Sequence, residues 1–255
     1  GAPKVQELSA TRNTQHATRN ADHASRLTSH VSRLTSDTSP PTSLAVILAH
    51  GDLDPTPEIC DLAARADLLI AADGGSLHAV ANGWWPHLLV GDLDSTPPGV
   101  RALLEAHGAQ VLQYPARKDE TDTELAVRVA IERGAGEIFL LGAIGGRLDH
   151  TLANILLLGL SELASVGVTL LAGRQRLFAI RSQVTVKGQV GDLLSLLPLA
   201  GDAIGIWTEG LEYPLRGETL RFGLPRGISN VLTTPTATVR VESGVLLGVL
   251  VPAET

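Results

Sequence analysis

Between residues 43 and 167, short apolar runs alternate with segments whose apolar residues have a helical spacing. The runs indicate buried strands, and the segments between them indicate amphipathic helices. We expect strands at 44–51, 67–75, 87–92, 109–115 and 137–146, and helices at 58–66, 76–83, 98–108, 121–134 and 150–167. This alternation is typical of a mostly parallel sheet covered by helices on both faces. Residues 43–167 are therefore predicted to form a three-layer α/β domain.

Beyond residue 168 the helical periodicity ends. Short segments rich in β-branched and aromatic residues follow one another, and turn residues separate them at regular intervals. This pattern is typical of antiparallel sheets packed face to face or closed into a barrel. Residues 168–255 are therefore predicted to form an antiparallel β-sandwich or barrel domain, which makes the fold class α/β followed by all-β.

The first part of the chain has a different character. Residues 10–37 contain four copies of a seven-residue unit, namely ATRNTQH, ATRNADH, ASRLTSH and VSRLTSD. The first and fourth positions of each unit are too small or too polar for the seam of a coiled coil. We therefore expect residues 1–42 to be a disordered repeat tail that ends at the SPPT segment.

Composition narrows the class of protein. The formal net charge of −7 argues against general nucleic-acid binding, which needs a basic surface. The longest apolar runs are too short to span a bilayer, and the polar start of the chain does not resemble a signal peptide. A single cysteine, Cys60, excludes an internal disulfide, so a reducing cytoplasm is the expected location.

The apolar run at 88–90 stops at Gly91, and two carboxylates, Asp92 and Asp94, follow. If the chain stays extended there, both side chains project to the same side, because side chains of a strand alternate with period two. Carboxylate oxygens are preferred ligands of hard cations such as Mg²⁺. Two interpretations stay open at this point: a metal site, or a solvated turn in which aspartate is favoured.

A second acidic segment, KDETDTE, covers residues 118–124 just before a predicted helix. Thr121 and Glu124 have the spacing of a capping box, which accounts for those two residues. It does not account for Lys118 or for Asp122. A lysine at the start of a helix can contact phosphate while a neighbouring aspartate helps to hold a metal ion.

Glycine-rich turns follow two further predicted strands. Asp73, Gly74 and Gly75 follow the second strand, and GAIGGRLDH at 142–150 follows the last strand of the α/β part. Glycine lets the backbone approach a ligand closely, and Arg147 offers a planar fork for phosphate. Taken singly, each segment also fits an ordinary turn or helix cap. Ligands of parallel sheets bind beyond the carboxyl ends of the strands, where all these segments fall.

Five motifs, ADGG, GDLDS, KDETD, GAIGGRLDH and GISN, occur in the order and approximate spacing of thiamin pyrophosphokinases. The chain resembles that family over about residues 44–251. The resemblance implies an enzyme that transfers pyrophosphate from ATP to the hydroxyl of thiamin, which gives thiamin diphosphate and AMP. It also implies a homodimer with active sites between the subunits.

The resemblance also implies roles for individual residues. The magnesium-binding carboxylates are Asp92, Asp94 and Asp122, which act in catalysis together with Arg147. The residues implied at the nucleotide are Asp73, Gly74, Gly75, Lys118, Gly146, Arg147, Asp149 and His150. The residues implied at the thiamin pocket, in the second domain with the dimer interface, are Tyr213, Ser229 and Asn230.

Two other functions fit parts of the sequence. DLDST at 92–96 fits the Asp-x-Asp-x-Thr signature of haloacid-dehalogenase-type phosphatases, in which Asp92 would be the nucleophile. The second half of the chain offers no convincing match to the later acidic motif that such a phosphatase needs. The other alternative is a non-catalytic module that binds nucleotide or thiamin without turnover.

Overall fold

A computed structural model describes residues 44–253. The predicted repeat tail at 1–42 lies outside the described residues. Among the described residues, no helix has both the length and the apolar character needed to cross a membrane.

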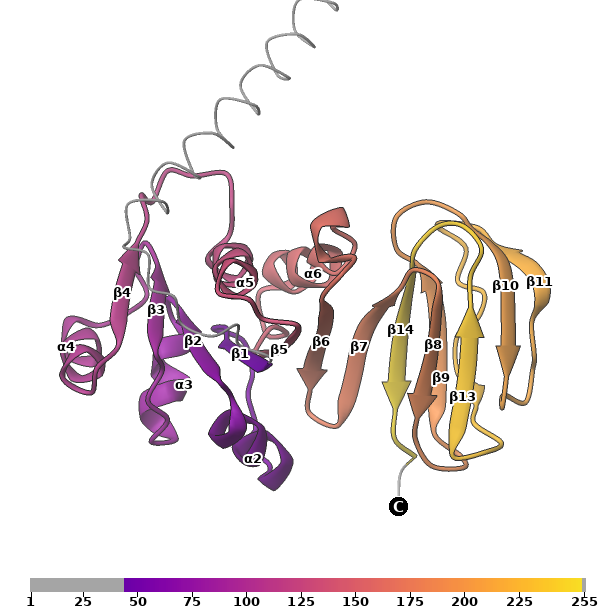
Figure 1. Cartoon of the computed structure of the whole chain (residues 1–255), viewed down its shortest axis with the longest axis horizontal. Coiled ribbons are helices and arrows are strands. Elements are labelled where there is room, and N and C mark those ends of the chain that lie inside the picture. Colours follow the sequence, from indigo (N-terminus) through magenta and orange to yellow (C-terminus); the bar gives the residue numbers. More distant parts are fainter. Residues whose placement is uncertain (1–43, 254–255) are drawn as a thin grey trace, which may run out of the picture. The chain divides into compact units, whose positions relative to one another are not determined.

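The first half of the described chain contains a parallel sheet. Its strands are β1 (Leu44–Leu48), β2 (Leu68–Ala72), β3 (Leu88–Gly91), β4 (Gln110–Gln113), β5 (Glu137–Leu141) and β6 (Gly167–Ala172). They lie side by side in the order β6-β5-β1-β2-β3-β4, as Figure 1 shows. Every neighbouring pair among them is parallel. The predicted parallel sheet is confirmed.

Helices connect these strands. They are α2 (Pro57–Arg65), α3 (Gly75–Ala81), α4 (Pro98–Ala106), α5 (Asp122–Glu132) and α6 (Leu148–Leu157). The single helix expected at 150–167 is wrong. The chain becomes extended at Leu160 (φ −60°, ψ 135°), and only a short 3₁₀ turn, η1 (Ser161–Leu163), follows before β6.

The helices cover both faces of the parallel sheet. On one face, Leu125 and Val129 of α5 pack in the same core as Ile47 of β1. On the other face, Ile59 of α2 packs in the same core as Val46 of β1. Each face thus buries its own apolar cluster, which confirms the predicted three-layer arrangement.

The second half of the chain is antiparallel. Strands β7 (Gln175–Ile180), β9 (Leu193–Pro198), β12 (Asn230–Val231) and β14 (Leu246–Val251) extend the first sheet to ten strands. A second sheet contains β8 (Gln183–Lys187), β10 (Ala203–Glu209), β11 (Arg216–Leu220) and β13 (Thr236–Arg240). Apolar side chains of both sheets, such as Leu246 and Val239, share one buried core. The predicted sandwich is confirmed.

The ten-stranded sheet joins the two halves. Strand β6 is parallel to β5 and antiparallel to β7, so it belongs to both kinds of sheet. A boundary at 167/168 therefore falls inside β6, in a sheet without a break. The assignment of residues 43–167 and 168–255 to separate domains stays a prediction.

Two glycines allow a matched test of this packing. A Cβ at Gly75, the first residue of α3, would lie 1.9 Å from the carbonyl oxygen of Leu48 in β1. A Cβ at Gly99 in α4 meets no described atom within 4 Å. We expect Gly75→Ala to lower the free energy of unfolding by about 1–3 kcal/mol or more through overpacking. Gly99→Ala should raise it by about 0.5–1 kcal/mol, because alanine restricts the unfolded chain. Urea unfolding followed by circular dichroism measures both, and equal effects would contradict the packing of α3 on β1.

Candidate active site

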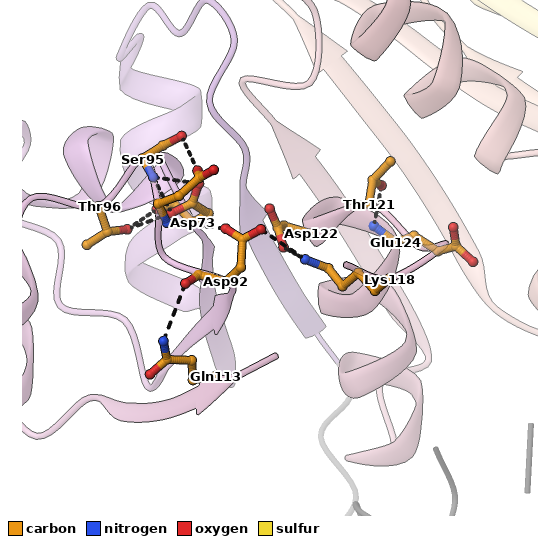
Figure 2. Close-up of polar contacts among 10 residues, drawn as sticks. Asp73, Asp92, Ser95, Thr96, Gln113, Lys118, Thr121, Asp122 and Glu124 are labelled. Atoms are coloured by element: carbon orange, nitrogen blue, oxygen red, sulfur yellow. Dashed lines mark hydrogen bonds and ion pairs between the residues drawn. The ribbon is translucent and has the colours of Figure 1, made fainter. Parts of the chain in front are cut away.

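Three aspartates meet at the carboxyl edge of the parallel sheet. Asp73 follows β2, Asp92 follows β3, and Asp122 is the first residue of α5. One carboxylate oxygen of each lies within 4.8 Å of the others. Figure 2 shows the three side chains converging from these separate elements. Such a set of oxygen atoms is able to hold a divalent cation, since hard cations prefer carboxylate ligands.

The position of Asp73 depends on its neighbours. Its backbone is left-handed, with φ +39°. The amide of Ser95 donates to both carboxylate oxygens at 3.2 Å, and the Thr96 hydroxyl lies 3.0 Å from Oδ1 (Figure 2). Burial raises the pKa of Asp73 and the charge of Asp122 adds to this, while the hydrogen bonds from Ser95 and Thr96 oppose it. Ser95 and Thr96 belong to the DLDST segment at 92–96, but their hydrogen bonds to Asp73 were not predicted from the sequence.

Asp94 does not join the other carboxylates. Leu93 has φ +67°, so the chain leaves the extended conformation directly after Asp92. The condition under which Asp92 and Asp94 would project to the same side, an extended chain through both residues, is therefore not met. The Asp94 carboxylate accepts a hydrogen bond from the Ser95 hydroxyl at 2.9 Å. In the three-carboxylate group of the described residues, the third member is Asp73, and a metal role for Asp94 stays a prediction.

Lys118 provides the positive charge beside the carboxylates. Its Nζ lies 2.8 Å from Asp122 Oδ1 and 3.4 Å from Asp92 Oδ2, and its side chain is only 10% exposed. Burial lowers the pKa of Lys118, but the hydrogen bonds and charges of Asp122 and Asp92 outweigh it and leave the pKa above its usual value. The lysine therefore remains charged and partly neutralises the repulsion between the two aspartates.

The start of α5 is fixed by a helix cap. The Thr121 hydroxyl accepts a hydrogen bond from the Glu124 amide at 3.1 Å. The Glu124 carboxylate accepts instead from Arg128 one turn later, so the described contacts form half of the expected capping box. The cap places Asp122 at the N-terminus of the helix, where the helix dipole favours a negative charge.

The carboxylates border a cavity of about 690 Å³. The residues expected at metal or nucleotide that line it are Asp73, Gly74, Asp92, Asp94, Lys118, Asp122, Gly146, Arg147 and His150. Gly75 and Asp149 do not line it. His50, Gly51, Glu120 and Asn154 also line it, although no site role was predicted for any of the four. His50 and Gly51 directly follow an apolar strand, and this position in the sequence was the feature that could have placed them at the site.

Two loops of this cavity pack backbone against backbone. The Gly51 amide donates to the Gly142 carbonyl at 2.6 Å, and a Cβ at Gly145 would lie 2.9 Å from Gly51 Cα. His78 Nε2 lies 2.7 Å from the Gly51 carbonyl oxygen. The glycines after β1 and β5 are therefore needed for the close approach of the two loops, in addition to any contact with a ligand.

Arg147 and Asp149 form an exposed pair beside the cavity. Two guanidinium nitrogens of Arg147 lie 3.0 and 2.6 Å from the two oxygens of Asp149. The hydrogen bonds from Arg147 hold the pKa of Asp149 well below its usual range. The arginine fork is thus engaged by a carboxylate within its own loop, and an incoming phosphate would compete with that carboxylate for it.

The residues implied at the thiamin pocket lie in the antiparallel half. The Tyr213 amide donates to Asn230 Oδ1 at 3.0 Å, and Asn230 Nδ2 donates to the Tyr213 carbonyl at 2.7 Å. Ser229 has φ +58°, and its amide donates to the Ser195 hydroxyl at 2.9 Å. The structure therefore brings Tyr213 and Asn230 together, with Ser229 adjacent. None of the three lines the carboxylate cavity.

Two family models match this chain. The model for the thiamin pyrophosphokinase catalytic domain matches residues 59–170, and the model for the vitamin B1 binding domain of the same family matches residues 181–246. The chain belongs to the thiamin pyrophosphokinase family. The three clustered aspartates fall within the catalytic-domain match, and Tyr213, Ser229 and Asn230 fall within the vitamin B1 match.

Individual relatives agree with this family. Thiamine pyrophosphokinase from Bacillus subtilis is 28% identical over 203 residues, which are 79% of this chain and 95% of the relative. Thiamine pyrophosphokinase 3 from Oryza sativa is 26% identical over 206 residues, or 70% of this chain and 76% of the relative. These matches confirm the enzyme class that the sequence motifs predicted.

Solved structures of the family share the fold. The crystal structure of the Bacillus subtilis thiamine pyrophosphokinase has a TM-score of 0.73 and 27% identity, covering 83% of this chain and 100% of that one. Yeast thiamin pyrophosphokinase has a TM-score of 0.68 at 16% identity, covering 84% and 88%, which shows the fold alone.

The ion pairs of Lys118 allow a prediction about the stability of the site with and without Mg²⁺. In Lys118→Gln the clustered carboxylates lose their internal cation, so we expect the metal-free protein to lose about 1–3 kcal/mol of unfolding free energy. Mg²⁺ should restore more stability to the variant than it adds to the wild type, because it no longer competes with the ammonium group. Urea unfolding with EDTA and with Mg²⁺ measures both quantities.

Lys187→Gln is the matched control, because Lys187 is exposed and lies outside the cavity. This variant should respond to Mg²⁺ as the wild type does. Equal stabilisation of Lys118→Gln and wild type by Mg²⁺ would show that Lys118 and the metal ion do not compete.

Proposed function

We propose that this member of the family transfers the pyrophosphoryl group of ATP to the hydroxyl of thiamin. The observation that carries the proposal is the convergence of Asp73, Asp92 and Asp122 with Lys118 in one cavity at the carboxyl edge of the sheet. Nucleotides bind at this edge in parallel α/β sheets. The matches to a catalytic and a vitamin B1 binding model support the choice of substrates.

The donor set of the cavity fits Mg²⁺. Asp122 Oδ1 is buried, and within the described residues it is paired with Lys118 Nζ at 2.8 Å. Asp73, Asp92 and Asp122 would hold the ion, and Asp94 borders the same cavity. When bound, Mg²⁺ neutralises phosphate charge and orients the phosphate chain.

The residues of the chain would then position two substrates. Lys118 and Arg147 contact phosphate oxygens, and the glycines of the β2–α3 and β5–α6 loops let the backbone approach the nucleotide. The hydroxyl oxygen of thiamin forms a bond to the β-phosphorus. The bond from that phosphorus to the α–β bridging oxygen breaks, AMP leaves with that oxygen, and the hydroxyl proton passes to the solvent. Alignment and charge neutralisation supply most of the rate enhancement in such a transfer.

Formation of AMP tests this function. We expect the purified chain to form AMP from ATP and Mg²⁺ only when thiamin is present, with thiamin diphosphate as the co-product, measured by chromatography. Asp122→Asn should lower the rate on the order of 100-fold or more, since charge stabilisation by a held metal ion is worth several kcal/mol. Asp54→Asn, which changes an exposed aspartate outside the cavity, is the control.

Other products would assign another function. Hydrolysis of a phosphate monoester that Asp92→Asn abolishes, without any need for thiamin, would favour the phosphatase alternative. Binding of ATP or thiamin without AMP formation would favour a non-catalytic module. Either result would contradict pyrophosphoryl transfer.

We also propose that the protein is a homodimer whose active sites lie between subunits. Leu148, Leu152 and Leu156 of α6 are 73%, 58% and 58% exposed and recur every four residues, so they form one apolar helix face. That helix begins at the loop that lines the carboxylate cavity. A second copy that covers this face would bring its own thiamin residues near the cavity, which the residues of one chain do not line.

A charge on this face tests the dimer. We expect Leu152→Glu to weaken dimerisation by at least about tenfold, because a carboxylate would be buried in the interface. Thiamin-dependent AMP formation should fall with it. Sedimentation velocity over a range of concentrations measures the dissociation constant. Leu103→Glu, at an exposed leucine of α4, is the matched control and should leave the dimer intact. Equal sedimentation of both variants would contradict this interface.

A further inference from the structure

A second cavity, of about 360 Å³, shares no residue with the carboxylate cavity. It lies where β6 and β7 of the large sheet meet β8, the edge strand of the small sheet, and it extends to Leu158 and Leu163 after α6. Its volume is at the small end of the range of about 300–1,000 Å³ that is typical of ligand pockets. A small organic molecule fits such a space, whereas a whole nucleotide with its phosphates is too large for it.

The charged residues of this cavity are all basic. Arg176, Arg181 and Lys187 line it, and its lining contains no aspartate or glutamate. Within the described part of the chain, none of the three forms an ion pair with a carboxylate. The chain as a whole has a net charge of −7, yet this cavity has three basic side chains and no carboxylate in its lining. Its lining would therefore attract an anion.

Both arginines use only some of their hydrogen-bond donors in contacts with the described residues. Arg181 Nη2 donates to the carbonyls of Leu158 and Leu160, both at 2.7 Å, and Arg176 Nη2 donates to the Lys187 carbonyl at 2.8 Å. These bonds fix the guanidinium groups but leave the Nε and Nη1 donors of each without a partner among the described residues. Burial lowers the pKa of Arg181, as expected for a cation whose charge is not compensated.

The rest of the lining is apolar. Phe178, Val168 and Val184 contribute to the wall, together with Leu163 from the segment after α6. The cavity thus combines apolar walls with three basic side chains, an arrangement that suits a molecule with an apolar part and an anionic part. A purely inorganic anion would leave the apolar wall in contact with water.

We propose that this cavity binds a small organic anion, with a phosphate or carboxylate group at Arg176 and Lys187, where the Arg176 guanidinium contacts the Lys187 carbonyl, and an apolar body against Phe178. A planar guanidinium group pairs with either kind of head group through two parallel hydrogen bonds. The site is separate from the carboxylate cavity, and the proposal does not depend on the proposed catalytic function.

Fluorescence of 8-anilinonaphthalene-1-sulfonate, an apolar anion, reports binding to the full-length chain. EDTA in the buffer keeps the carboxylate cavity negative, so that it repels the anionic probe. We expect phenyl phosphate and benzoate to displace the probe, and benzamide, which is neutral, to displace it at least about tenfold less well. Whichever anion displaces at the lower concentration identifies the preferred head group.

Variants locate the site. Arg176→Gln should weaken binding of phenyl phosphate and benzoate by about tenfold or more, and Lys187→Gln should weaken it in the same direction. Arg174→Gln, at an exposed arginine of the adjacent turn that does not line the cavity, should bind as the wild type does. If Arg176→Gln does not fold, the affinity of Lys187→Gln for the two anions tests the proposal instead. The Lys187 side chain is exposed, so its replacement should not prevent folding. Wild-type affinity of Lys187→Gln for both anions, or equal displacement by benzamide and benzoate, would overturn the proposal.

Discussion

The repulsion between three carboxylates at one edge of the sheet is the constraint on which the arrangement of residues at the carboxyl edge of the parallel strands depends. Asp73, Asp92 and Asp122 place oxygen atoms within 4.8 Å of one another, which is unfavourable unless positive charge is present. Lys118 supplies that charge to two of them, and the Ser95 amide and Thr96 hydroxyl stabilise the third. The cluster therefore presents three carboxylates to the dication that we propose it holds.

The backbone at the end of β3 is shaped by the same cluster. A Cβ at Gly91 would lie 2.9 Å from Asp122 Oδ1 and 3.0 Å from Asp73 Cβ, so only glycine lets the two aspartates approach across the strand end. Gly91 and Leu93 both have positive φ, which turns the chain away from the sheet directly around Asp92. The sharp turn separates Asp92 from Asp94 and places Ser95 and Thr96 beside Asp73. Local backbone strain and the carboxylate geometry are thus two aspects of one arrangement.

The periodicity of the sequence was sufficient for most of the fold. Fully apolar strands and amphipathic helices predicted the parallel layer, and the loss of helical spacing predicted the sandwich. Positions that depend on φ could not be predicted in this way. The Asp-x-Asp spacing was compatible with both an extended chain and a turn, because no residue type in Asp92-Leu93-Asp94 indicates the left-handed backbone of Leu93. Likewise, β6 belongs to the parallel sheet by its pairing with β5, which is a contact between distant segments that local pattern does not encode.

The two cavities use basic side chains in opposite ways. In the first, Lys118 is paired with carboxylates, so its charge is already compensated. In the function we propose, it would become available to a phosphate when a metal ion binds the carboxylates. In the second, Arg176 and Arg181 have neutral carbonyl partners, which orient a guanidinium group but leave its charge uncompensated. Because an ion pair and a carbonyl contact both fix a side chain, rigidity alone does not distinguish the two cavities. The difference lies in the remaining charge, and it makes the first suited to a cation and the second to an anion.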